Sequence, residues 1–236
     1  MDYTILIYYI SGILIFVAIL ISLFAQIKVQ STYEKYSKEK SSLNITGGDF
    51  AKKLSIEQGL QLNINTCSGK LSDHYNSKDK SLNISAENYN SDSVASLAVV
   101  AHEFGHAMQD NEQYVPLKIR QLVIKTSNLI SKWLMPLIII SVILSLFVGL
   151  AGTIILAVMV GVYAISLLAN LVTLPVEVNA SKRAMMLINQ MNVSEDEKSK
   201  MKQMLSAAAM TYVAALLVSL VYFLRFLSLF LLTRRD

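Results

Sequence analysis

Long uncharged runs constrain what this chain can fold into more than any other feature of its sequence. Residues 3–27 contain no charged side chain, and 25 helical residues are more than enough to cross the roughly 30 Å hydrocarbon core of a bilayer. A second uncharged run covers 44 residues from Trp133 to Val176, and a third apolar run begins at Ala207. Only 16% of the 236 residues are charged, against about 25% in ordinary soluble domains. The sequence therefore predicts a mainly α membrane protein.

The lengths of these runs predict four transmembrane helices. The 44-residue run is about twice as long as one span requires, and Gly149 and Gly152 lie near its middle, which indicates a helical hairpin. The first run lacks a basic segment before it and a cleavage site after it, so we interpret it as an uncleaved anchor. The expected segments are an N-terminal anchor (1–27), a polar region (28–132), the hairpin (133–175), a polar helix (176–203) and a C-terminal transmembrane helix (204–236).

The distribution of charge predicts on which side of the membrane the two polar regions lie. Two crossings separate them, so they share one side, and together they hold 18 of the 21 Lys and Arg residues. The positive-inside rule places them in the cytoplasm of a multi-pass protein of the cell membrane. Residues 28–132 carry 13 basic and 11 acidic side chains without a basic stripe. We therefore expect the lipid bilayer, and no nucleic acid, as a partner.

The larger polar region has the pattern of a small α+β unit. A helix is expected from Thr46 to Gly59, and alternating apolar residues predict short strands at 60–64 and 82–84. Residues 93–109 form a helical pattern that is apolar nearly all round, which indicates a buried helix. Residues 115–132 are expected to form an amphipathic connector along the membrane surface.

The predicted buried helix contains an H-E-x-x-H motif formed by His102, Glu103 and His106. Residues four apart lie on one helical face, so both imidazoles can reach a single ion while Glu103 projects beside them. Imidazole suits zinc, and a catalytic zinc site typically has three protein ligands and one open position. Burying these side chains in an apolar helix is costly unless they bind a metal or hydrogen-bond one another. We predict one zinc ion per chain; a hydrogen-bonded structural cluster is the alternative.

A third zinc ligand has few candidates in this sequence. The remaining histidine is His74, and Glu177 follows Pro175 and Val176 where the second hairpin helix would leave the membrane. Two crossings return the chain to the side that it left, so Glu177 could complete a His-His-Glu site. The alternative is an interfacial carboxylate that is solvated at the start of a helix.

Three sequence runs carry a resemblance to a known family: GKLSDHYNSKDKSLNIS, SVASLAVVAHEFGHAMQ and LPVEVNASKRA. They resemble the YugP family of membrane zinc metallopeptidases. More distantly, the order of an H-E-x-x-H motif, two spans and a Glu before an Ala is similar to HtpX-type membrane proteases. The resemblance implies a zincin-like unit in which His102, His106 and Glu177 bind zinc and Glu103 is the general base.

The chain departs from the patterns of both families near the expected third ligand. Asn179 stands where YugP-type proteins usually have Asp, and Ser181 stands where HtpX-type proteins have Asp. Neither residue supplies the negative charge that would orient and polarise a ligand histidine. Losses of such support typically reduce affinity or activity by about 10- to 100-fold.

The function that we expect is zinc-dependent endopeptidase activity on proteins or peptides at the cytoplasmic membrane face. Zinc would activate a water molecule, and Glu103 would accept its proton and later protonate the leaving amine. His74 and Tyr75, which precede the second strand, are the first candidates for stabilising the oxyanion. Arg183 and Tyr222 are further candidates for this role.

Two other functions stay open from the sequence. A non-catalytic membrane adaptor with a structural zinc site would contain the same motif. A transporter or channel is less well supported, because Arg225 is the only ionisable side chain besides tyrosine in the predicted spans. We expect Arg225 to extend to the far membrane interface.

Overall fold

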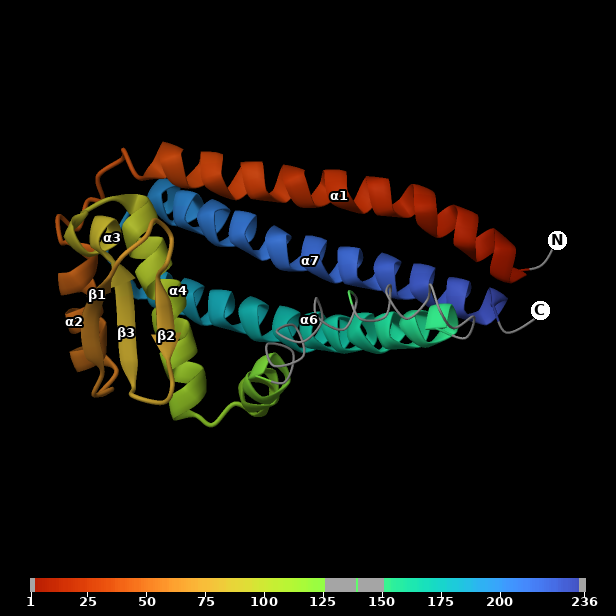
Figure 1. Cartoon of the computed structure of the whole chain (residues 1–236). Coiled ribbons are helices and arrows are strands. Elements are labelled where there is room, and N and C mark those ends of the chain that lie inside the picture. The colour runs from red at the N-terminus through yellow and green to blue at the C-terminus, as the bar shows by residue number, and fades with distance from the viewer. Residues whose placement is uncertain (1–2, 126–138, 140–150, 234–236) are drawn as a thin grey trace. The chain divides into compact units, whose positions relative to one another are not determined.

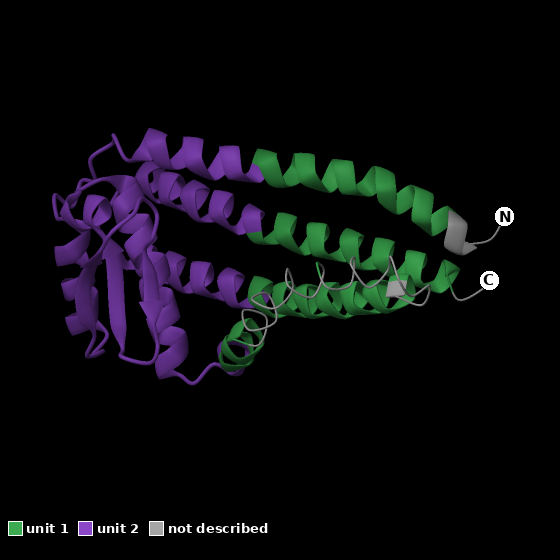
Figure 2. Ribbon diagram, in the orientation of Figure 1, with its two compact units in different colours: residues 1–24, 118–174, 212–236 green, residues 25–117, 175–211 purple. Residues whose placement is uncertain are grey.

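Three long helices run through most of the protein, whose computed structural model describes residues 3–125, 139 and 151–233. They are α1 (Tyr3–Tyr36), α6 (Ala151–Gln190) and α7 (Glu195–Leu232) (Figure 1). The chain divides into unit 1, with residues 1–24, 118–174 and 212–236, and unit 2, with residues 25–117 and 175–211 (Figure 2). The unit boundaries fall inside these three helices, so each helix contributes residues to both units.

Three helices in the described part of the chain are long and apolar enough to cross a membrane, at Leu6–Tyr36, Gly152–Gln190 and Glu195–Leu232. They correspond to the expected anchor, the second half of the hairpin and the last span. The first half of the hairpin falls on residues 133–138 and 140–150, which lie outside the described residues.

Helix α6 corrects one expectation about the third ligand. It runs without a break through Pro175 and Glu177, so Glu177 lies in the interior of a helix and not at its start. Only 1% of Glu177 is exposed. The alternative of a solvated carboxylate at a helix start is therefore wrong.

Unit 1 uses Arg225 in a contact between two helices. Its Nη1 donates a hydrogen bond to the carbonyl oxygen of Tyr8 at 2.9 Å, and its guanidinium lies 4.2 Å from the centroid of the Tyr8 ring. A Cβ atom on Gly12 would come within 2.9 Å of the same Nη1. Arg225 thus binds α1, and the absence of a side chain at Gly12 leaves space for its guanidinium.

Unit 2 contains a small mixed sheet. Its strands are β1 (Asn63–Cys67), β2 (His74–Asn76) and β3 (Ser81–Ser85), in the order β1-β3-β2 (Figure 1). β1 pairs with β3 in parallel, and β2 pairs with β3 antiparallel. β3 confirms the strand predicted at 82–84, whereas β1 begins three residues later than predicted. β2 is too short for alternation to reveal it.

Helices cover this sheet and form the core of unit 2 with it. They are α2 (Gly47–Glu57), α3 (Ala86–Asn90) and α4 (Val94–Asn111), and the side chains of Thr46 and Ser93 cap α2 and α4. α4 packs against α2, β2 and β3, and most of its residues are buried. A further helix covers residues 115–125, whereas the expected connector continues into residues outside the described part. The largest fully buried apolar side chains are Tyr33, Phe50, Leu82, Ile84, Leu97, Phe104, Ile188 and Met201.

Candidate metal centre

Two helices of unit 2 bring the three predicted ligands together. α4 supplies His102 and His106, one turn apart, and α6 supplies Glu177. The Nε2 atoms of His102 and His106 lie 3.2 and 3.5 Å from the same oxygen, Oε2 of Glu177. One potential ligand atom from each residue lies within 4.8 Å of the other two. The four-residue spacing of the motif and the contact between α4 and α6 thus place the three predicted ligands around a common point.

The geometry of this cluster fits zinc. Two donors bound tetrahedrally at about 2.0–2.1 Å from an ion are about 3.4 Å apart, close to the observed separations of 3.2 and 3.5 Å. Two imidazoles and one carboxylate are a donor set typical of catalytic zinc. The Glu177 side chain is only 2% exposed, and buried charges in proteins are paired or bind metals.

Glycine within the motif allows α4 and α6 to approach closely. A Cβ atom on Gly105 would lie 2.5 Å from the carbonyl oxygen of Ala180, one turn after Glu177 in α6. Such a distance is far below van der Waals contact, so any side chain at Gly105 would push the two backbones apart. The glycine therefore helps Glu177 to reach the histidines.

Glu103 lies next to the ligands and is held by the sheet. Its Oε2 accepts a hydrogen bond of 3.1 Å from the backbone N–H of Tyr75 in β2. Burial raises the pKa of Glu103 above its ordinary value; the two imidazoles oppose this increase, and the carboxylates of Glu177 and Asp73 add to it. A carboxylate with a raised pKa suits a group that must both accept and donate a proton.

The two residues predicted to stabilise an oxyanion have different surroundings. The Tyr75 hydroxyl donates to Asp110 Oδ2 at 2.8 Å, and only its backbone N–H reaches Glu103. Burial and this bond to Asp110 raise the pKa of Tyr75. The His74 ring is exposed, and its Nδ1 lies 2.9 Å from the Ser72 carbonyl oxygen. The structure thus brings the backbone of Tyr75, and not the His74 ring, to the cluster.

The other two oxyanion candidates are also engaged elsewhere. The Arg183 Nη atoms bond both carboxylate oxygens of Glu112, at 2.5 and 2.7 Å. Tyr222 belongs to unit 1, where its ring stacks on Tyr163 with centroids 5.2 Å apart.

The outer nitrogens of the two predicted ligand histidines have polar partners. His106 Nδ1 lies 2.9 Å from Gln109 Oε1, and His102 Nδ1 lies 3.2 Å from Ser181 Oγ. Asn179 contacts Gln109 instead: its Oδ1 accepts a hydrogen bond of 2.9 Å from Gln109 Nε2. No sequence pattern singled out Gln109, although its position three residues after His106 places it on the same helical face.

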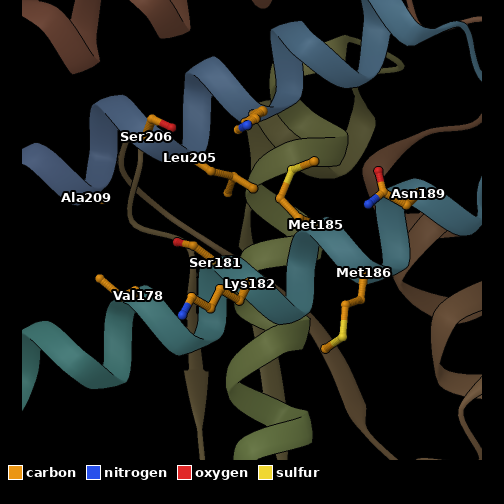
Figure 3. A pocket seen from close by; sticks show the side chains of 10 residues that line it. Val178, Ser181, Lys182, Met185, Met186, Asn189, Leu205, Ser206 and Ala209 are labelled. Atoms are coloured by element: carbon orange, nitrogen blue, oxygen red, sulfur yellow. The ribbon is translucent and has the colours of Figure 1, made fainter.

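A groove lies between α6 and α7 (Figure 3). Ser181, Met185 and Lys182 line it from α6, and Leu205 and Lys202 line it from α7. None of the three predicted ligands lines the groove, which therefore adjoins the centre only through residues around Ser181.

Comparison with known proteins agrees with this geometry. The sequence model of a family described as "Putative neutral zinc metallopeptidase" matches residues 11–231. The chain is 35% identical over 218 residues to the "Putative membrane protease YugP" of Bacillus subtilis (strain 168), covering 92% of this chain and 94% of that protein. No solved structure matches the chain. The match extends from the first long helix to the last and includes the motif and Glu177, so the chain belongs to this zinc metallopeptidase family.

Proposed function

We propose that this protein is a zinc-dependent endopeptidase of the cell membrane that cleaves proteins or peptides at the cytoplasmic face. The observation that carries the proposal is the convergence of His102, His106 and Glu177, with Glu103 beside them. Membership of a zinc metallopeptidase family supports zinc and peptide hydrolysis. The excess of Lys and Arg in the two polar regions supports the cytoplasmic side.

The residues of the chain have distinct tasks in this reaction. When bound, zinc supplies Lewis-acid polarisation and lowers the pKa of water to about 7. His102, His106 and Glu177 would hold the ion, and three protein ligands are the number typical of catalytic sites. Glu103 accepts a proton from the attacking water and donates it to the leaving amine, while the Tyr75 N–H keeps its carboxylate in place.

The edge of the sheet offers a place for an extended substrate. β2 is an edge strand, and the Tyr75 N–H on its free side points to Glu103. A peptide that ran along this edge would pass the proposed general base, but it could not pair with the Tyr75 N–H, which already donates to Glu103.

A membrane adaptor with a structural zinc ion is the second candidate function. Structural zinc sites are normally closed by four protein ligands. In the described part of the chain the cluster has three members, which favours the catalytic interpretation.

The experiment that tests the proposal compares Glu103→Gln with Glu177→Ala in full-length protein in nanodiscs. We expect Glu103→Gln to keep about one zinc per chain and to lose peptide hydrolysis by about 100-fold or more. Glu177→Ala should lose both zinc and activity. Glu57→Gln is the matched control, because Glu57 is an exposed acid on α2 whose nearest ion-pair partner is Lys53. Undiminished hydrolysis by Glu103→Gln would refute the proposed mechanism.

A further inference from the structure

We propose that Gln109 is a positioning residue that fixes the orientation and the tautomer of His106, and that Asn179 and Arg183 in turn fix Gln109. The inference rests on the metal-binding role of His106 proposed above. It concerns how the chain prepares a ligand before any metal binds, and it assigns a task to three residues outside the ligand set.

Gln109 connects the two helices that carry the ligands. It lies on α4 and is fully buried. Its Oε1 is 2.9 Å from His106 Nδ1, and its Nε2 donates to the Val176 carbonyl oxygen at 2.8 Å and to Asn179 Oδ1 at 2.9 Å. Val176 immediately precedes Glu177, so one side chain contacts both a ligand histidine and the backbone next to the ligand carboxylate.

The direction of the hydrogen bonds in this network follows from Arg183. A guanidinium can only donate, so the Asn179 atom that lies 2.8 Å from Arg183 Nε must be its oxygen. One end of the Gln109 amide therefore contacts two acceptors, Asn179 Oδ1 and the Val176 carbonyl oxygen. This end must be the NH₂ group, because only a donor can bond two acceptors.

The opposite end of the Gln109 amide is then an oxygen, which can only accept. His106 Nδ1 must therefore carry a proton to form the 2.9 Å hydrogen bond. In the neutral ring this leaves the lone pair on Nε2, the nitrogen that faces Glu177 at 3.5 Å. The network thus selects the tautomer that binds a metal.

The second ligand histidine lacks such a one-way partner. His102 Nδ1 lies 3.2 Å from the Ser181 hydroxyl, which can donate or accept by rotating. The selection of a tautomer therefore acts at His106 and not at His102.

The network also gives a role to the departure at Asn179. Asn and Asp both present an oxygen toward Arg183 and Gln109, so either residue can orient the Gln109 amide. Arg183 is itself held by both oxygens of Glu112, which keeps its Nε directed at Asn179. We therefore expect an acceptor, and not a negative charge, to be the requirement at position 179.

This inference is tested by measuring the zinc affinity of the detergent-purified protein. The measurement uses competition with a chromophoric chelator at fixed pH. We expect Gln109→Leu to weaken zinc binding by about 10- to 100-fold, the usual effect of removing a partner of a ligand histidine. Asn179→Leu should weaken it by about tenfold, and Asn179→Asp should stay within about threefold of the native chain.

Ser96→Ala is the matched control, because Ser96 is a buried residue of α4 whose hydroxyl donates to the Asn88 carbonyl oxygen at 2.6 Å. It should leave zinc affinity unchanged. Nitrogen NMR of histidine-labelled, metal-free protein, recorded at a pH at which the His106 ring is neutral, should show a protonated Nδ1 and an unprotonated Nε2 at His106. This preference should disappear in Gln109→Leu.

Two outcomes would overturn the inference: native zinc affinity in Gln109→Leu, or equal losses in Asn179→Asp and Asn179→Leu. The Asn179 pair decides the matter if Gln109→Leu does not fold, since Asn179 is only partly buried. A native protein that binds no zinc would instead contradict the proposed function, so the two failures are distinguishable.

Discussion

Two regions of unit 2 each bury a carboxylate, and the carboxylates have different kinds of polar partners. Glu177 on α6 and Glu197 on α7 are 1% and 6% exposed. Glu197 accepts hydrogen bonds from the hydroxyls of Ser41 and Ser42, the latter at 2.7 Å, and from the Ser42 N–H at 3.3 Å. Glu177 faces imidazole nitrogens at 3.2 and 3.5 Å.

The difference teaches that burial alone does not identify a metal ligand. Hydroxyl and amide donors satisfy a carboxylate without any further partner. At His106, whose Nδ1 proton leaves the lone pair on Nε2, the neutral ring cannot donate to Glu177, so a cation between them is needed for attraction. The region around Glu177 is therefore expected to depend on zinc, and the region around Glu197 is expected to contribute to folding only.

The largest effect should separate the two carboxylates. We expect Glu177→Ala to weaken zinc binding by more than about 100-fold, beyond the loss from removing a residue that merely supports a ligand. Glu197→Ala should bind zinc as the native chain does. Metal analysis after dialysis against a fixed free-zinc concentration measures both, and a zinc-loaded Glu177→Ala protein would erase the distinction.

The close approach of the helices beside Glu177 provides the next test. Gly105→Ala places a Cβ atom 2.5 Å from the Ala180 carbonyl oxygen, so α4 and α6 must separate. We expect a loss of about 1–3 kcal/mol in the free energy of unfolding, the usual cost of overpacking, together with weaker zinc binding. Chemical denaturation and chelator competition measure the two effects. Gly161→Ala is the matched control, because a Cβ atom at Gly161 would meet open space. Gly59→Ala is unsuitable, because Gly59 has φ +64°, a conformation that strains any other residue.

Glu197 should have an effect on stability without an effect on the metal. We expect Glu197→Ala to lower the free energy of unfolding by about 1–3 kcal/mol, because three donors lose their buried acceptor. Denaturation of the metal-free protein measures this loss. A change in zinc affinity that matches the change at Glu177 would show that the two regions are coupled.

The smallest effect is expected at the outer nitrogen of His102. Ser181→Ala removes the hydroxyl that lies 3.2 Å from Nδ1, and we expect zinc binding to weaken by about tenfold or less. Ser206→Ala, in the same groove on α7, is the matched control. A loss as large as that in Glu177→Ala would mean that Ser181 is part of the ligand set.

Local sequence patterns predicted much of α4, the helix that carries the histidine pair. Four-residue spacing places His102 and His106 on one face, and the structure assigns the cap of α4 to Ser93. In α7, Ser194 and Glu197 have the spacing of a capping box, but only half of that motif forms: the Glu197 N–H donates to Ser194 Oγ at 3.1 Å, whereas the Glu197 carboxylate bonds Ser41 and Ser42. Where a side chain can choose between a local and a distant partner, sequence spacing cannot decide.

The sequence by itself determined the long apolar helices, the buried helix and the histidine pair, because these depend on periodicity and capping within a few turns. Only the tertiary structure decided that α6 continues unbroken through Glu177, that the Tyr75 backbone holds Glu103, and that Gln109 supports His106. Glu177 is 75 residues from His102 in sequence, and Glu103 is 28 residues from Tyr75. Contacts over such separations depend on how closely the helices and the sheet pack, which no local pattern encodes.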